Sequence, residues 1–225
     1  MKDDINWDRT NALISQGLYS GFSKFLLDTS HKQLVKFGNR RAKPGNSILE
    51  IGAGKGELYT FVRGDFSQYL MTDISYWGKT EIEKIISSDD RVRFELQDIE
   101  KLSLPANTFG RVICTCVLIH IDQPFQALRE LERVTKKGGL ISFYIAADPG
   151  ALLRYMRLVI TSPKMKDLGV PYSLINALSH RNNAGGLVEM SKYVFKDSKI
   201  TFTYYPFLVK SWNLSTHIIV NVLKK

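Results

Sequence analysis

The sequence contains few cysteines, no long apolar run and no excess of acidic residues. Its 225 residues include only two cysteines, Cys114 and Cys116. Two positions this close in a strand point to the same face, and a disulfide between them would strain the backbone, so we expect both thiols to be reduced. Reduced cysteines are typical of the cytoplasm.

The chain also lacks the features of membrane and secreted proteins. No run approaches the roughly 18 to 20 apolar residues that a bilayer-spanning helix requires. The chain begins Met-Lys-Asp-Asp, and no apolar stretch follows, which is untypical of a secretory signal. We therefore expect a cytoplasmic protein without a membrane span.

The charge balance favours an anionic partner without selecting one. The chain has 31 lysines and arginines against 22 aspartates and glutamates, a formal net charge of +9. Nucleotides, phosphorylated sugars, nucleic acid and anionic membranes would all be attracted, but a merely soluble surface can carry the same charge. The basic residues are spread out, with no run longer than two. No cluster of His, Cys, Asp and Glu has metal-ligand spacing, so we expect no bound metal.

The apolar patterns predict one domain in four parts. Residues 1–45 carry apolar residues at helical spacing, and residues 46–147 alternate short apolar runs with helical segments. That alternation predicts a parallel sheet with helices on both faces. Residues 148–186, with Pro, Gly and basic residues, predict an insertion that caps the sheet. Residues 187–225 predict a closing helix and antiparallel strands. The expected strands cover 47–51, 68–72, 92–96, 111–117, 140–146, 200–205 and 211–223, and the expected central helices cover 55–62, 76–87 and 125–135.

The clearest chemical motif is a glycine-rich turn after the first central strand. It reads Glu50-Ile51-Gly52-Ala53-Gly54-Lys55-Gly56. Glycines allow a tight turn and a close approach of the backbone to a ligand, and ligands bind beyond the carboxyl ends of parallel strands. A dinucleotide fingerprint needs glycine where Glu57 stands, and a P-loop needs Ser or Thr where Gly56 stands. Both of these nucleotide-phosphate readings therefore fit poorly.

The motif and those that follow it resemble the class I S-adenosylmethionine-dependent methyltransferases. Asp73 ends the second strand, and Gln97-Asp98-Ile99 ends the third. Residues 111–122 resemble the family's fourth-strand motif, and residues 132–140 resemble its turn into the fifth strand. The resemblance covers about residues 45–147. It implies a Rossmann-like, doubly wound, mostly parallel seven-stranded sheet with an antiparallel last strand, an N-terminal helical lid and a helical insertion after the fifth strand.

The resemblance also implies the cofactor, S-adenosylmethionine, with S-adenosylhomocysteine as product. In the family, the acid matching Asp73 binds the ribose hydroxyls, the acid matching Asp98 bonds the adenine amino group, and the residue matching Ile99 covers the ring. The cofactor-binding residues expected from it are Glu50, Gly52, Ala53, Gly54, Gly56, Asp73, Ile74, Asp98, Ile99, Cys116 and, from the lid, Tyr19. A cofactor-free or differently liganded relative with the same sheet is the alternative, because fold alone does not fix function.

The candidates for acceptor chemistry lie after the fourth strand and in the insertion. His120 follows the fourth strand and is either a general base or a structural residue. Arg181 is a candidate anion clamp, and Arg154 lies one helical turn from Arg157. A solvated loop and an amphipathic surface helix are the alternatives. The expected substrate-binding residues are His31, Arg154, His180, Arg181 and Asn182.

These features lead to a specific functional hypothesis. Residues 148–154, 180–182 and 205–214 are similar to methyltransferases of bacterial surface-polysaccharide clusters, which implies O-methylation of a small anionic or sugar-type acceptor such as a capsule or O-antigen precursor. The alternatives are an RNA or protein methyltransferase that uses the basic surface, and a non-catalytic binding subunit. The chain has no Asn/Asp-Pro-Pro-Tyr/Phe motif and no RNA-binding module, so we do not expect nucleic acid as a partner. We expect a monomer or a homodimer.

Overall fold

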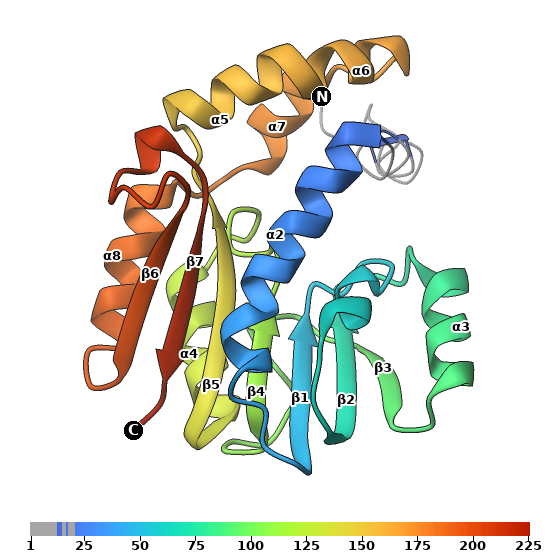
Figure 1. The fold of residues 1–225 in the computed structure, drawn as a ribbon, viewed down its shortest axis with the longest axis vertical. Coiled ribbons are helices and arrows are strands. Elements are labelled where there is room, and N and C mark those ends of the chain that lie inside the picture. Colours follow the sequence, from blue (N-terminus) through green and yellow to red (C-terminus); the bar gives the residue numbers. More distant parts are fainter. Residues whose placement is uncertain (1–12, 15–16, 18–20) are drawn as a thin grey trace.

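A seven-stranded sheet forms the centre of the molecule (Figure 1). The computed structural model describes residues 13–14, 17 and 21–225. The strands are β1 (Asn46–Ile51), β2 (Phe66–Asp73), β3 (Val92–Leu96), β4 (Phe109–Cys114), β5 (Thr135–Ala146), β6 (Lys199–Pro206) and β7 (Ser215–Leu223). Their order is β3-β2-β1-β4-β5-β7-β6. The first five strands pair in parallel, and β7 runs antiparallel to both β5 and β6, which confirms the predicted fold class.

Helices cover both faces of the sheet. They are α2 (Gly21–Asn39), the 3-10 turn η1 (Glu57–Phe61), α3 (Lys79–Ser88), α4 (Pro124–Val134), α5 (Ala151–Met156), the π-helical turn η2 (Arg157–Thr161), α6 (Ser162–Asp167), α7 (Tyr172–Ser179), α8 (Ala184–Val194) and the 3-10 turn η3 (Trp212–Leu214). Leu34 of α2 and Ile82 of α3 pack on one face. Leu128 of α4 and Leu187 of α8 pack on the other. Each face therefore buries its own apolar layer.

Two local expectations about the central part are wrong. The predicted helix over residues 55–62 is only the short turn η1, because the chain still turns through Gly56 at a φ of 80° and must enter β2 at Phe66. The predicted strand over 111–117 ends at Cys114, since Cys116 adopts a φ of 53° that no strand residue has. The two cysteines therefore do not share a strand face: Cys114 is buried and Cys116 is exposed, and both are free thiols.

A helical cap lies over the carboxyl ends of the parallel strands (Figure 1). It consists of α5, η2, α6 and α7, which follow β5. The cap has a small apolar cluster of its own around Met165 and Ile175, and Leu13 and Ile14 from the N-terminal part of the chain pack against that cluster. No helix within the described residues combines the length and the apolar character that crossing a bilayer demands.

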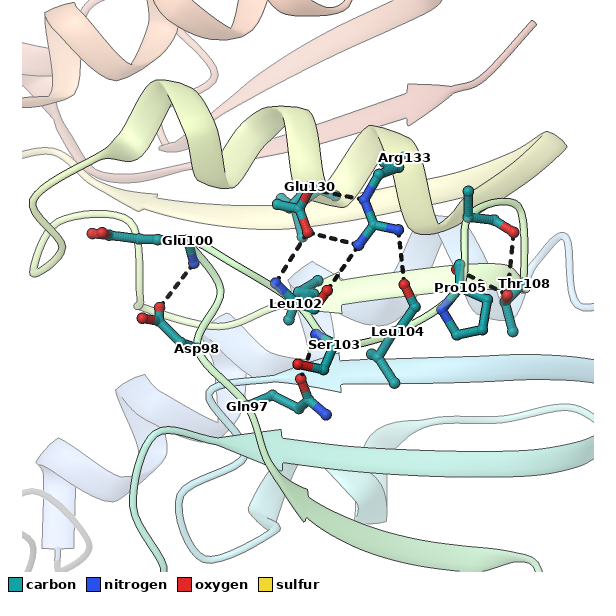
Figure 2. Close-up of polar contacts among 12 residues, drawn as sticks. Gln97, Asp98, Glu100, Leu102, Ser103, Leu104, Pro105, Thr108, Glu130 and Arg133 are labelled. Atoms are coloured by element: carbon teal, nitrogen blue, oxygen red, sulfur yellow. Dashed lines mark hydrogen bonds and ion pairs between the residues drawn. The ribbon is translucent and has the colours of Figure 1, made fainter.

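A charged pair on α4 fixes the chain between β3 and β4 (Figure 2). Glu130 Oε2 accepts the amide hydrogen of Leu102 at 3.0 Å. The guanidinium of Arg133 donates to Glu130 at 2.7 Å and to the carbonyl oxygens of Leu102 and Leu104 at 3.0 and 2.7 Å. The hydrogen bonds from Arg133 lower the pKa of Glu130. This network holds in place the segment that begins with Asp98.

We expect Arg133→Met to lower the free energy of unfolding by about 1.5–3 kcal/mol, because Glu130 Oε1 and the carbonyl oxygens of Leu102 and Leu104 lose their donor. Urea unfolding measures the change. The matched control is Arg129→Met on the same helix, whose exposed guanidinium lies 4.6 Å from the centre of the Phe125 ring and for which we expect a loss below about 1 kcal/mol. Equal losses for the two variants would contradict the proposed importance of the network.

Candidate functional site

The glycine-rich turn leaves β1 at the carboxyl edge of the sheet. Gly52, Gly54 and Gly56 have φ values of 77°, 57° and 80°, a region that side-chain-bearing residues rarely adopt. A Cβ on Gly52 would stand 2.8 Å from the carbonyl oxygen of Thr115 and would overlap a methyl group of Val117. Only glycine therefore fits at position 52, and the turn lies directly against the loop that follows β4.

Asp73 joins the end of β2 to this turn. Its Oδ2 accepts the amide hydrogen of Gly54 at 3.0 Å, and its Oδ1 accepts that of Ser75 at 3.2 Å. The next side chain, Ile74, is 75% exposed. An acid beside an exposed apolar side chain can bind a polar sugar ring and an apolar base side by side.

Asp98 lies at the end of the neighbouring strand, β3. The amide of Gln97 donates to the carbonyl oxygen of Asp73 at 2.9 Å, so the two acid-bearing segments run side by side. Asp98 is exposed, and its Oδ1 accepts the amide hydrogen of Glu100 at 2.9 Å (Figure 2). The structure therefore brings both predicted acids to the same edge.

Glu50 is the most deeply buried charged side chain at this edge. It is 0% exposed, and the Tyr69 hydroxyl donates to its Oε2 at 2.7 Å. Desolvation raises the pKa of Glu50 to about 8, while the hydrogen bond from Tyr69 acts in the opposite direction. Glu50 Oε1 and Thr115 Oγ1 are buried and have no partner among the described residues. Two unpartnered oxygens beside a tight glycine turn fit a ligand that carries hydrogen-bond donors, such as an ammonium group.

Three further residues were predicted to bind the cofactor, and the structure places each of them in a different way. Cys116 stands beside the residues that pack over Gly52, so it belongs to the same edge. Ile99 does not point into the site as expected: it is 4% exposed and packs in the core with Leu102 and Leu118. Ile99 lies within a turn closed by the hydrogen bond from the amide of Lys101 to the carbonyl oxygen of Asp98. Tyr19 lies outside the described residues.

A cavity of about 880 Å³ lies under the cap. It is lined by residues of α5, η2, α6 and α7, by Asp148 and Pro149, and by the segment 180–183. Arg154, His180, Arg181 and Asn182 all line it. Four of the five predicted substrate-binding residues therefore meet around one space.

His31, the fifth predicted substrate-binding residue, does not join them. It lies on α2, 5% exposed, with its ring 5.9 Å from that of Phe61, and it does not line the cavity. Desolvation lowers its pKa to about 4, against the attraction of Asp28. We therefore assign His31 to core packing, because it belongs to the buried half of the helix.

Asp148, at the end of β5, is the polar centre of the cavity wall. Its Oδ2 accepts hydrogen bonds from His180 Nδ1 at 2.5 Å and from Arg157 Nη1 at 2.7 Å. The hydrogen bond from His180, followed by that from Arg157, lowers the pKa of Asp148 to about 2 despite partial burial. Sequence reasoning missed Asp148, although an acid at the carboxyl end of a strand is the same signal that identified Asp73 and Asp98.

The segment carrying His180 is fixed to the loop after β4. The amide of Arg181 donates to the Ile119 carbonyl at 2.8 Å, and the side chain of Asn182 donates to the Leu118 and Ile121 carbonyls at 2.9 and 2.7 Å. The guanidinium of Arg181 pairs with Asp122, so this arginine is not a free anion clamp.

His120 lies on the same loop after β4. Its Nδ1 lies 3.1 Å from the Ser179 carbonyl, and its ring lies 5.0 Å from that of His180. Desolvation of the ring lowers the pKa of His120, and the hydrogen bond to the Ser179 carbonyl opposes this shift. The neighbouring positive groups lower the pKa further. His120 is part of the same polar cluster but does not line the cavity.

Comparisons with known proteins point to one family. Residues 49–143 match the methyltransferase domain family. A ubiquinone/menaquinone biosynthesis C-methyltransferase of Azotobacter vinelandii is 30% identical over 154 residues, which cover 65% of this chain and 57% of that protein. A demethylmenaquinone methyltransferase of Clavibacter sepedonicus is 28% identical over 174 residues, which cover 72% of this chain and 65% of that protein. The chain therefore spans less than two thirds of the length of these relatives.

A solved structure has the same fold over nearly the whole chain. It is a protein of Methanococcus maripaludis described as an S-adenosyl-L-methionine-dependent methyltransferase. It superposes with a TM-score of 0.64 at 16% identity and covers 96% of this chain and 93% of that one. At this identity the likeness establishes the fold alone.

We expect Glu50→Gln to change how stability depends on pH. The folded protein favours protonated Glu50, so its contribution is complete below the ordinary pKa of 4.5 and is lost as pH rises through about 8. In the cofactor-free wild type, stability should therefore fall across this window, by up to about 1.4 kcal/mol per pH unit for one proton. The variant keeps an acceptor for Tyr69 and should not show this fall.

Urea unfolding between pH 5 and 9 tests this expectation. Glu83→Gln is the control, since Glu83 is an exposed residue that pairs with Lys79 on α3. If the Glu50→Gln protein keeps the wild-type slope, another group is responsible.

Proposed function

We propose that this chain, whose sheet domain belongs to the class I S-adenosylmethionine-dependent methyltransferase family, transfers a methyl group from S-adenosylmethionine to a small anionic acceptor. The proposal rests on two features that occur together. One is the edge of the sheet at Gly52, Asp73 and Glu50, where a tight glycine turn lies beside acidic groups, and the other is the arginine-lined cavity under the cap. Both adjoin the segment between Thr115 and Asp122.

The residues at the edge suit the parts of the cofactor. The two carboxylate oxygens of Asp73 suit ribose hydroxyls, and the exposed Ile74 suits the apolar face of the base. The unpartnered oxygens of Glu50 and Thr115 suit the ammonium group. When bound, the cofactor supplies an already activated methyl group, so the protein's task is to hold and orient the acceptor.

The cavity suits an anion with an apolar part. Arg154 is exposed, lines the cavity and has no ion pair among the described residues. Ser173 and Asn176 of α7 add polar groups to the wall, and Tyr155 and Leu158 form an apolar rim with exposed fractions of 61% and 69%. A phosphorylated or carboxylated sugar fits this lining, and we retain O-methylation of a surface-polysaccharide precursor as the specific form of the proposal.

Carbon methylation of an anionic aromatic acceptor is the second candidate. The apolar rim of Tyr155 and Leu158 favours it. One relative is named as a ubiquinone/menaquinone biosynthesis C-methyltransferase and another as a demethylmenaquinone methyltransferase. Mass spectrometry of the product distinguishes the two, because an O-methyl and a C-methyl group fragment differently.

The first test incubates the protein with methyl-labelled S-adenosylmethionine and a cell extract that is then separated into small metabolites and macromolecules. We expect label among small anions. We also expect Asp73→Ala to abolish transfer and to weaken S-adenosylhomocysteine binding at least tenfold, because it removes both oxygens at the end of β2. Asp65→Ala, at the opposite end of β2, is the matched control. Label in RNA or protein would overturn the small-acceptor proposal, and no binding of S-adenosylhomocysteine would favour a non-catalytic subunit.

For the labelled acceptor fraction, we expect Arg154→Gln to raise KM about tenfold or more, because a hydrogen bond to a charged group is worth about 1.5–3 kcal/mol. Affinity for S-adenosylhomocysteine should not change. Lys166→Gln on α6 is the control, as Lys166 belongs to the cap but does not line the cavity. An unchanged KM in Arg154→Gln would remove this arginine from the acceptor site.

A further inference from the structure

The pairing of His180 with Asp148 has a chemical consequence beyond binding. We infer that His180 is the proton acceptor for the acceptor's reacting hydroxyl and that Asp148 is its positioning residue. This inference rests on the proposed function, because it concerns the same reaction. It replaces His120, which the sequence suggested, with a histidine that lines the cavity.

The hydrogen bond fixes the tautomer of His180. Asp148 Oδ2 lies 2.5 Å from His180 Nδ1, and a carboxylate can only accept, so Nδ1 carries the hydrogen. In the neutral ring, Nε2 is then the nitrogen with a free lone pair. The two side chains are 15% and 18% exposed, so water competes little for this bond. A histidine held by a carboxylate in a partly buried wall has the arrangement of a general base.

His120 is less suited to this role. Its Nδ1 faces a backbone carbonyl, which fixes the ring but provides no negative charge for an imidazolium. The positive groups that act on it are Arg157, Arg181 and His180, and all three disfavour its protonation. His180 instead has the Asp148 carboxylate in direct contact.

The ionisable groups around His180 come from four elements. Asp148 follows β5, and Arg157 belongs to η2 and shares the same carboxylate oxygen. His120 lies on the loop after β4, and Arg181, next in the chain, is paired with Asp122. Arg154 of α5 lines the same cavity, and α7 contributes no carboxylate, lysine or arginine. Among the described residues, Asp148 is therefore the carboxylate in direct contact with the His180 ring.

The proposed step balances as follows. His180 Nε2 takes the proton of the acceptor's hydroxyl while that oxygen forms a bond to the methyl carbon. The bond between this carbon and the cofactor sulfur breaks, and its electron pair stays on sulfur as a thioether. The positive charge of the sulfonium is thus replaced by that of the imidazolium, which Asp148 stabilises.

The first test needs no acceptor. The protein has four histidines, and ¹⁵N-histidine spectra of the cofactor-free protein report which ring nitrogen carries the hydrogen. His180→Gln assigns the resonances of His180. We expect the Nδ1–H form in the wild type and a mixture of tautomers in Asp148→Asn, with Lys192→Gln on α8 unchanged. An Nε2–H form in the wild type would overturn the inference.

The second test follows transfer to the labelled small-molecule fraction as a function of pH. We expect His180→Gln to lower kcat about 10²- to 10⁴-fold and to remove the acid limb of the profile, without changing KM for S-adenosylmethionine. Asp148→Asn should lower kcat about tenfold or more without changing KM for S-adenosylmethionine, because the ring loses the carboxylate that fixes its tautomer. This variant tests the inference even if His180→Gln does not fold.

The outcomes separate the two proposals. If the wild-type protein transfers no methyl group, the proposed function fails and the base role fails with it. If the wild type is active and His180→Gln retains its kcat and acid limb, only the base role fails. Loss of the acid limb in His120→Gln, but not in His180→Gln, would return the role to His120.

Discussion

The close passage of the glycine turn under the loop after β4 is the constraint on which the rest of the site depends. The backbone of Gly52 lies so close to the Thr115 carbonyl oxygen and the Val117 side chain that a Cβ would not fit between them. The end of β1 and the segment from Thr115 onward are therefore in direct contact at the carboxyl edge. That segment continues to His120 and Asp122, whose neighbouring carbonyls bind the chain around Asn182. One stretch of loop thus borders the proposed cofactor edge and supports the proposed acceptor cavity.

Charge is distributed between these two regions in opposite senses. The edge at β1 and β2 presents acidic side chains: Asp73 bonds the glycine turn, and Glu50 is buried with one oxygen that has no partner among the described residues. The cap presents arginines, and of those that line the cavity Arg157 and Arg181 are neutralised by Asp148 and Asp122. A cationic donor and an anionic acceptor would each find an oppositely charged surface, which supports the proposed transfer reaction and opposes binding of either ligand in the wrong place.

The sheet could be predicted well from the sequence, because its strands are short apolar runs that end in acids or glycines. The prediction failed where a local pattern was ambiguous: the run after Gly56 has helical periodicity, yet the short path to β2 leaves room only for a 3-10 turn. Ile99, expected to cover the base, is buried in the core cluster instead of exposed at the edge, and the sequence motif alone did not indicate this burial. The pair of Asp148 and His180, 32 positions apart, could not be foreseen, because their contact depends on how the cap folds back.

The contact between the cap and the N-terminal part of the chain has an energetic consequence. Met165 is fully buried, and Leu13 and Ile14 pack against the cluster to which it belongs. Separating the cap from residues 13 and 14 would expose these apolar side chains to water, which costs free energy. Any opening of the cap during the proposed reaction that breaks this contact would therefore carry that cost.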